Sequence, residues 1–263
     1  MGLITAPLTV SIDGKEYRDR VDISTQEFYR ILPRCSELPH TSQVTAGTFE
    51  KIYREILARG DEVLSIHMSM KLSGTVQSAR IAKGEIPEQE ANISVIDSGT
   101  GSLGTQLLIR EAVKMRDAGA SLAAVTERLE TVKNRVRVLI GVDNLKYFMM
   151  GGRISKSAAI VGALLGIKPI INVADGFLTI AQKVRGMPAV YDWLAKRLKA
   201  DGFDPHFPPI FGYTGDHSRV EQLCRVMLSE AGIAEGDICE VGPVVGTHAG
   251  PGAVAVSYLL PEG

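Results

Sequence analysis

Apolar and polar residues alternate at the start of the chain, and helical spacing follows. Residues 8–12 alternate up to Asp13-Gly14, after which residues 15–17 resume an extended pattern. This arrangement predicts a β-hairpin closed by a two-residue primed turn. Residues 24–27, Ser-Thr-Gln-Glu, have the composition of a capping box and predict the start of a helix, which Pro33 ends.

Strands and helices then alternate along the chain. Helices are expected at residues 48–58, 103–118 and 122–132, and a further helix is expected to begin at Thr75. The expected strands cover residues 62–67, 93–96 and 136–142. Such alternation predicts βαβ units and a mainly parallel sheet. Ligands of parallel sheets lie beyond the carboxyl ends of the strands. Loops 68–74 and 97–101 are therefore candidate binding loops.

The pattern changes after Gly151. Asp175-Gly176 separates two short apolar runs, which predicts a second hairpin. Helices are expected at 187–200 and 219–231, and strands near 209–213, 238–245 and 253–260. We therefore predict an α/β protein of two domains. The first, residues 1–145, is a parallel-sheet α/β domain, and the second, residues 146–263, is an α+β domain.

Composition excludes several classes of protein. The 263 residues are 45% hydrophobic and 22% charged, as in ordinary globular proteins. The net charge of −1 offers no general attraction to nucleic acid. The longest apolar stretch, residues 158–167, is too short to span a membrane, and no signal peptide is evident, so we expect a cytoplasmic protein. Three scattered cysteines predict neither disulfides nor a metal site.

Two Ser/Thr-containing motifs stand just before expected helices. They are Thr41-Ser42-Gln43 and Leu72-Ser73-Gly74-Thr75. Hydroxyl groups and free backbone amides at a helix N-terminus bind anions without any full positive charge. The simpler interpretation is that these residues only cap their helices, because Ser and Thr are preferred there. The motifs therefore indicate either a carboxylate or phosphate site, or ordinary caps.

Two glycine-rich segments are further candidate binding sites. Residues 246–252, Gly-Thr-His-Ala-Gly-Pro-Gly, are expected to form a loop in which His248 lies where the backbone can approach a ligand closely. Residues 151–155 form a glycine turn that presents Arg153 and Ser155 before an apolar segment. Anion binding, partner binding and a simple helix start remain competing interpretations of this turn.

Several short motifs, taken in order, resemble those of the DegV family. They are TSQ at 41–43, LSGT at 72–75, Ile96-Asp97-Ser98, GGRIS at 151–155, the run 167–176 and VGTHAGPGA at 245–253. The resemblance extends from about Pro7 to Leu260. The combination of GGRIS with GTHAGPG is the most specific part of it. Better-known members of this family are the fatty-acid-binding subunits of bacterial fatty acid kinase.

The resemblance implies that the protein binds a fatty acid and catalyses nothing itself. It implies an acyl chain buried between two domains, with its carboxylate held by Thr41, Ser73 and His248. No cofactor or metal is expected. The loops that support the carboxylate site would contain Ser42, Gly74, Thr75, Asp97, Ser98, Gly250 and Gly252.

The resemblance also implies a partner, a separate kinase subunit that phosphorylates the bound carboxylate. Arg153, Lys183 and Arg185 form the clearest local basic group for its docking, although solvated strand charges explain them nearly as well. Transient contact with a membrane is compatible with this role. The sequence leaves the length and saturation of the acyl chain open.

The chain departs from the family pattern in two places. Val44 stands where the family usually has proline. The family also has a strand and a helix before the segment that matches residues 3–12. We therefore expect the first domain to show a strand-wide gap, or to fill it by pairing with another chain.

Three other functions compete with fatty acid binding. Ser73, His248 and Asp97 could be the triad of a serine hydrolase that acts on acyl esters, although no G-x-S-x-G motif surrounds Ser73. A phosphate or nucleotide module would use the same helix N-termini but lacks the usual glycine motifs. A DNA-binding regulator would need a basic stripe that the sequence does not show.

Overall fold

The computed structural model describes residues 2–154 and 166–262. Its first unit is a three-stranded antiparallel sheet in the order β2-β1-β3, formed by β1 (Thr9–Ile12), β2 (Lys15–Arg18) and β3 (His40–Ser42). The turn residues Asp13 and Gly14 both have positive φ, 47° and 80°, so the predicted primed turn is confirmed.

The predicted start of a helix after Ser24 is also confirmed. Helix α1 (Thr25–Ile31) begins after Ser24, whose hydroxyl oxygen accepts a hydrogen bond of 3.1 Å from the backbone N–H of Glu27. A 3₁₀ turn, η1 (Leu32–Arg34), follows and contains Pro33. One core cluster joins this helix to the hairpin, with Phe28 fully buried.

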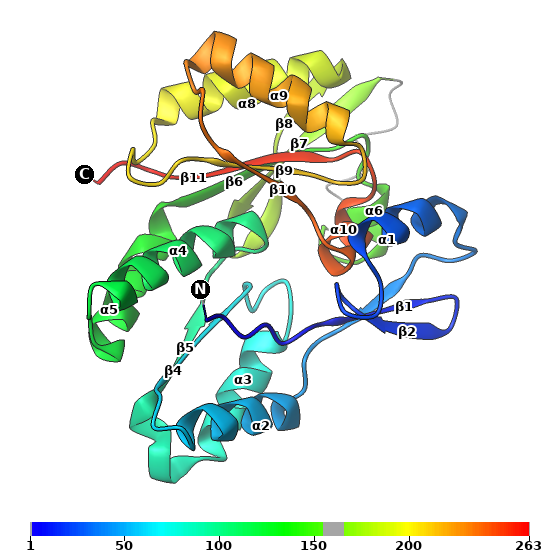
Figure 1. Ribbon diagram of the computed structural model, residues 1–263. Helices are drawn as coiled ribbons and strands as arrows, with labels where there is room; N and C mark the ends of the chain where they lie inside the picture. Colours follow the sequence, from blue (N-terminus) through cyan, green and yellow to red (C-terminus); the bar gives the residue numbers. More distant parts are fainter. Residues whose placement is uncertain (1, 155–165, 263) are drawn as a thin grey trace.

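The second unit is the parallel pair β4 (Val63–His67) and β5 (Ile93–Asp97). One face packs on helices α2 (Ala46–Leu57) and α3 (Thr75–Gly84), and the 3₁₀ segment η2 (Pro87–Asn92) precedes β5. The other face packs on α4 (Leu103–Asp117) and α5 (Leu122–Val132), as Figure 1 shows. The βαβ prediction is therefore confirmed for this unit.

A six-stranded mixed sheet in the order β10-β9-β11-β6-β7-β8 forms the largest unit. Helices α8 and α9 cover one of its faces, and α4 covers part of the other (Figure 1). The strands and helices that complete the chain are η3 (Lys133–Arg135), β6 (Val136–Gly141), α6 (Lys146–Met150), β7 (Ile167–Ala174), β8 (Phe177–Arg185), α8 (Gly186–Asp201), β9 (Ile210–Tyr213), α9 (His217–Ala231), β10 (Asp237–Glu240), α10 (Pro243–Ala249) and β11 (Val254–Leu259).

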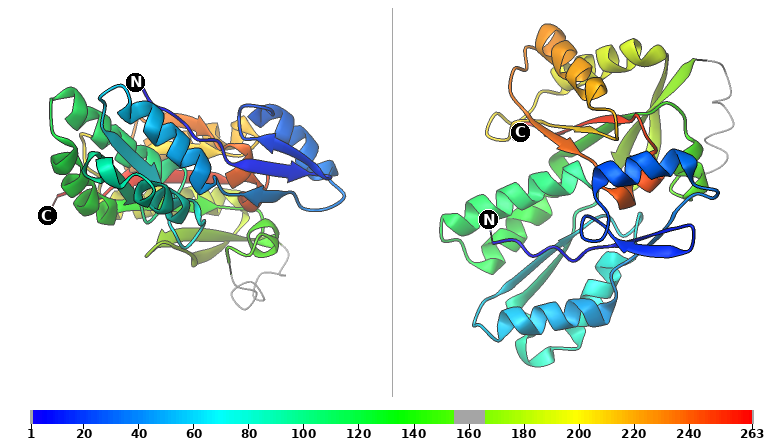
Figure 2. Two further views of the ribbon diagram at one scale, coloured as in Figure 1. Left: turned by 90° about the horizontal axis from the view of Figure 1, so that it is seen from below. Right: turned by 45° about the vertical axis from the view of Figure 1, so that its right-hand side comes forward.

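The α/β class and the second hairpin are confirmed, but one expected loop is wrong. Residues 243–249 form helix α10, which begins with Pro243 at a position where its missing N–H costs nothing. The expected strand 238–245 accordingly ends at Glu240. Helix α10 lies against α1, as the right-hand view of Figure 2 shows.

The predicted division near residue 145 remains a proposal. It would separate β6 from both strands that it pairs with, β7 and β11. Within residues 2–154 and 166–262, β4 and β5 pair only with each other. In the same part of the chain, no helix is both long and apolar enough to cross a bilayer.

Candidate functional site

A largely apolar cavity lies between the six-stranded sheet and the loops that follow β3 and β4. The volume of the cavity that no atom fills, including the solvent at its open mouth, is about 1100 Å³. Its apolar lining includes Leu8, Met68, Leu72, Leu103, Val138, Ile140, Phe148, Val173, Leu178, Val241 and Val244.

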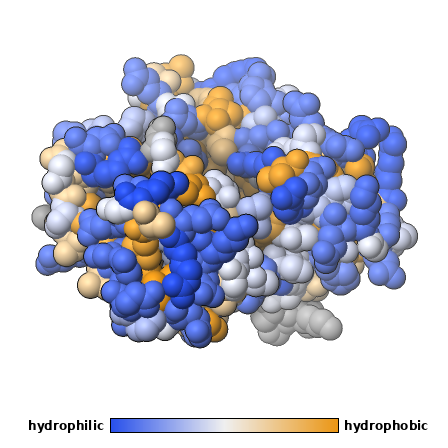
Figure 3. Space-filling model, turned by 60° about the horizontal axis from the view of Figure 1, so that its bottom comes forward, coloured by the Kyte–Doolittle hydropathy of each residue, from blue (hydrophilic) through white to orange (hydrophobic). Residues whose placement is uncertain are grey.

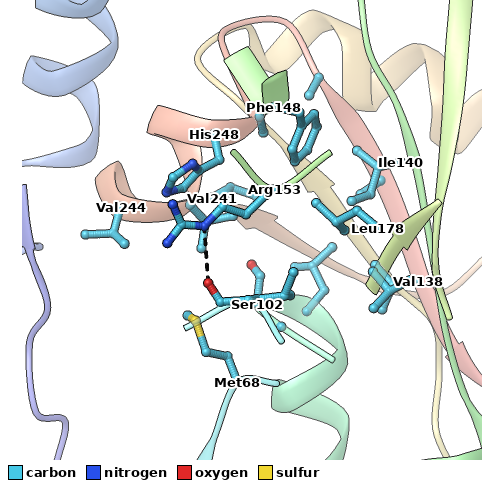
Figure 4. A pocket seen from close by; sticks show the side chains of 18 of the residues that line it. Met68, Ser102, Val138, Ile140, Phe148, Arg153, Leu178, Val241, Val244 and His248 are labelled. Carbon is cyan, nitrogen blue, oxygen red and sulfur yellow. Dashed lines mark hydrogen bonds between the residues drawn. The ribbon is translucent and has the colours of Figure 1, made fainter. Parts of the chain in front are cut away.

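The outer surface is different in character from this lining. In Figure 3 most of the visible face is hydrophilic, and apolar residues show only in small groups between hydrophilic ones. In Figure 4, Ile140, Leu178 and Val138 stand along one side of the cavity, away from His248. The cavity therefore has a polar end and an apolar end, as an amphipathic ligand requires.

Thr41, Ser73 and His248 all line this one cavity, although 207 residues separate Thr41 from His248. Thr41 lies in β3, where it pairs with Val10 of β1. Its hydroxyl oxygen is 3.1 Å from Nε2 of His248, which lies in the last turn of α10. The structure therefore brings together the three residues that the resemblance selected.

His248 is uncharged in this setting. Burial, with the Arg153 guanidinium as the second cause, lowers the pKa of His248 from 6.5 to about 4. Its Nδ1 is buried and has no hydrogen-bond partner among the described residues. A buried N–H without an acceptor is costly, so we assign the ring proton to Nε2, which then donates to Thr41. The hydroxyl hydrogen of Thr41 is then free to point into the cavity.

Ser73 stands at the start of α3. Its hydroxyl oxygen accepts a hydrogen bond of 3.3 Å from the backbone N–H of Thr75 and lies 2.9 Å from the hydroxyl of Thr75. Helix α4 also begins at the cavity, where Ser102 has an unusual positive φ of 49°. The cavity therefore receives the positive ends of two helix dipoles, which favours an anion there. Loop 68–74 lines the cavity, and its role in binding stays a prediction.

Arg153 also lines the cavity, a position that the sequence did not predict. Its Nη1 donates to the carbonyl of Gly151 at 2.6 Å, and its Nε donates to the carbonyl of Leu72 at 3.2 Å. Figure 4 shows its guanidinium beside the ring of His248. The GGR motif indicated an anion site as one of three interpretations, but nothing in it showed that the arginine points inward. Ser155, the other residue of that motif, lies outside the described residues.

The expected supporting residues differ in where they lie. Ser42 and Gly74 line the cavity, and Thr75 is buried beside it. Asp97 accepts hydrogen bonds from the backbone N–H groups of Gly99 and Met70, and Ser98 is buried in the same loop. These last two residues shape the loop and do not line the cavity.

Gly250 and Gly252 follow α10 with positive φ values of 73° and 78°. A Cβ at Gly250 would lie 2.2 Å from the ring of Tyr147. The carbonyl of Gly252 accepts a hydrogen bond of 2.6 Å from Arg219. A Cβ at Gly252 would lie 2.9 Å from Arg219, so both glycines permit close packing in the segment after α10.

Lys183 and Arg185 lie apart from the cavity. Both belong to β8, which is an edge strand of the six-stranded sheet. Arg185 is exposed, Lys183 is half-buried, and neither lines the cavity. Arg153 therefore lines the cavity, whereas Lys183 and Arg185, which the sequence grouped with it, do not.

A hydrolase triad is not assembled in this arrangement. His248 contacts Thr41 through Nε2, and no carboxylate bonds its Nδ1 in the described part of the chain. Asp97 instead bonds backbone N–H groups of its own loop and of loop 68–74. A serine triad needs the acid to orient the histidine and the histidine to contact the serine.

The fold and site define an α/β protein with a largely apolar cavity that has a polar end, and sequence comparison identifies its family. The family described as "Uncharacterised protein, DegV family" matches residues 1–260. The chain therefore belongs to the DegV family. It is 34% identical over 258 residues to a DegV domain-containing protein of Caldanaerobacter subterraneus subsp. tengcongensis, covering 98% of this chain and 91% of the relative.

Two solved structures are similar throughout. A DegV family protein from Thermus thermophilus, described by its fatty acid binding, has 34% identity and a TM-score of 0.87 and covers 97% of this chain and 91% of its own. A stearic-acid-binding protein from Eubacterium ventriosum has 28% identity and a TM-score of 0.84, with 97% and 90% covered. The resemblance noted in the sequence is thus confirmed at the level of family and fold.

Proposed function

We propose that this protein binds one long-chain fatty acid and presents its carboxylate to a separate kinase, which forms an acyl phosphate. One observation carries the proposal: Thr41, Ser73 and His248, from three distant segments, all line one largely apolar cavity, and the Thr41 hydroxyl contacts His248. The fatty acids that similar solved structures bind support it.

The carboxylate would receive hydrogen bonds from the hydroxyl groups of Thr41 and Ser73. His248 would hold the Thr41 hydroxyl in the donating orientation from behind. Arg153 would supply the nearest positive charge, since its remaining guanidinium N–H groups are close to His248. A buried anion is costly unless it is paired and hydrogen-bonded, and this set of donors meets that requirement.

The acyl tail would supply most of the affinity. Burial of roughly fifteen methylenes at about 0.8 kcal/mol each gives a gross gain on the order of 12 kcal/mol. Each hydrogen bond to the carboxylate would contribute only about 1.5–3 kcal/mol. The polar groups therefore set the position of the ligand more than its affinity.

Mass spectrometry of lipid extracted from the recombinant protein tests the proposal directly. We expect one fatty acid per chain in the wild type. After removal of lipid, Thr41→Val should weaken fatty acid binding about 10- to 100-fold, because it deletes the hydroxyl and keeps the shape. Thr179→Val, on the exposed face of β8, is the matched control. Absence of any fatty acid, together with no binding after reloading, would reject the proposal.

The kinase would dock on the basic residues of the edge strand β8. Arg185→Glu should lower acyl phosphate formation and leave the fatty acid content unchanged. A parallel loss of both would instead show that Arg185 acts on the fold or on the cavity. As a further part of the proposal we place the protein in the cytoplasm, which suits its three free cysteines.

A further inference from the structure

The cavity owes part of its depth to two very small residues in the centre of the six-stranded sheet. Gly212 of β9 and Ala255 of β11 are direct partners across the two strands, and both line the cavity. Ala255 is in turn paired with Ile140 of β6, which lines the cavity as well. Gly212 and Ala255 are smaller than Ile140 in the same row, so Leu103 can pack directly over Gly212.

Leu103, at the start of α4, packs against Gly212 from the opposite side of the cavity. A Cβ built on Gly212 would lie 2.6 Å from Cδ1 of Leu103, well inside contact distance. Leu103 is 2% exposed and belongs to a core cluster with α5 and β6, so most of its surroundings are filled. Because Leu103 also lines the cavity, open space lies on the cavity side of it.

We propose that Gly212 and Ala255, with Leu103 opposite them, determine how long an acyl chain the cavity accepts. The inference rests on the proposed fatty acid binding and adds which residues set its selectivity. A side chain at Gly212 would occupy part of the floor and push Leu103 into the remaining space. Long acids would then lose contacts that shorter acids do not make.

The variant Gly212→Ala tests this with the smallest available change. The φ of Gly212 is not positive, so the backbone allows alanine there. Restoring an ordinary contact of at least 3.5 Å requires Leu103 to retreat by about 1 Å. A shift of this size displaces about one methylene, and each methylene changes affinity about fourfold, so binding of octadecanoic acid should weaken about fourfold relative to dodecanoic acid.

Gly141→Ala is the matched control. Gly141 lies in β6, and its added Cβ would be 2.2 Å from Cγ1 of Val190, on the α8 side of the sheet and outside the cavity. It imposes a similar clash within the same sheet without narrowing the cavity. We expect a loss of stability in this variant but an unchanged ratio of the two affinities.

Dissociation constants of delipidated protein for the two acids decide the matter. An unchanged ratio in folded Gly212→Ala, or an equal change in Gly141→Ala, overturns the inference. If Gly212→Ala does not fold, Ala255→Val makes the same test with a residue that favours strands. Wild-type protein that binds neither acid refutes the proposed function itself, which separates the two failures.

Discussion

His67 should make the stability of the protein fall as the pH drops from about 6.5 to about 4. Its ring lies at the end of β4, 8% exposed, with Nε2 2.7 Å from the hydroxyl oxygen of Ser65. That oxygen already accepts a 2.7 Å hydrogen bond from the hydroxyl of Tyr53, so its own hydrogen is directed to Nε2. A proton on Nε2 would leave two hydrogens facing each other.

The shift of the pKa follows from this setting. Burial is the largest cause, and it lowers the pKa of His67 from 6.5 to about 4; Asp97 opposes the shift and Arg80 adds to it. Because the folded state resists protonation while the unfolded state accepts it, the contribution to stability is complete above about pH 6.5. It is lost progressively as the pH falls towards 4. Between pH 7.5 and 4.5 the loss is about 2–3 kcal/mol.

Urea unfolding at a series of pH values measures this loss. His67→Gln cannot be protonated and should show a shallower decline in the free energy of unfolding between pH 7.5 and 4.5 than the wild type. Carboxylates also titrate below pH 5, so only the difference between the two proteins is diagnostic. His40→Gln, at an exposed position of β3, is the control. Equal slopes for the wild type and His67→Gln would refute the argument.

Two further substitutions test the contacts around the chain terminus and the cavity. Asp204→Ala should lower the free energy of unfolding by about 2 kcal/mol, because the Arg135 guanidinium, 15% exposed, loses its buried partner at 2.7 Å and keeps the exposed Glu262. A shift in melting temperature of less than about 2 °C would contradict this. Gly151→Ala should reduce fatty acid content at least tenfold, because its Cβ would lie 2.1 Å from Nδ1 of His248. Gly47→Ala in α2, where the added Cβ meets nothing within 4 Å, should leave that content unchanged.

Local features of the fold could be predicted because they depend on residues close together in the chain. Asp13-Gly14 and Asp175-Gly176 each combine two residues that tolerate positive φ, and each closes a hairpin. Ser24 caps a helix through Glu27, three residues away. The candidate site residues came from the family resemblance, since a hydroxyl or imidazole in the sequence alone is explained equally well by capping or by the surface.

Helix α10 shows what only the tertiary structure decided. The three glycines of residues 246–252 predicted a loop, because glycine disfavours an isolated helix. The folded chain stabilises the helix from outside: Asp19 accepts a hydrogen bond of 3.0 Å from the backbone N–H of Val244. Gly246 then allows Tyr29 of α1 to approach so closely that a Cβ would lie 2.3 Å from its hydroxyl oxygen.

The inward direction of Arg153 and the meeting of Thr41 with His248 were decided in the same way. Each depends on contacts between segments far apart in the chain, and no pattern within one segment records the distance between them. The sequence by itself therefore determined the local elements and, through family resemblance, the candidate carboxylate-binding residues. The packing of α10 against the hairpin unit determined that those residues share one cavity.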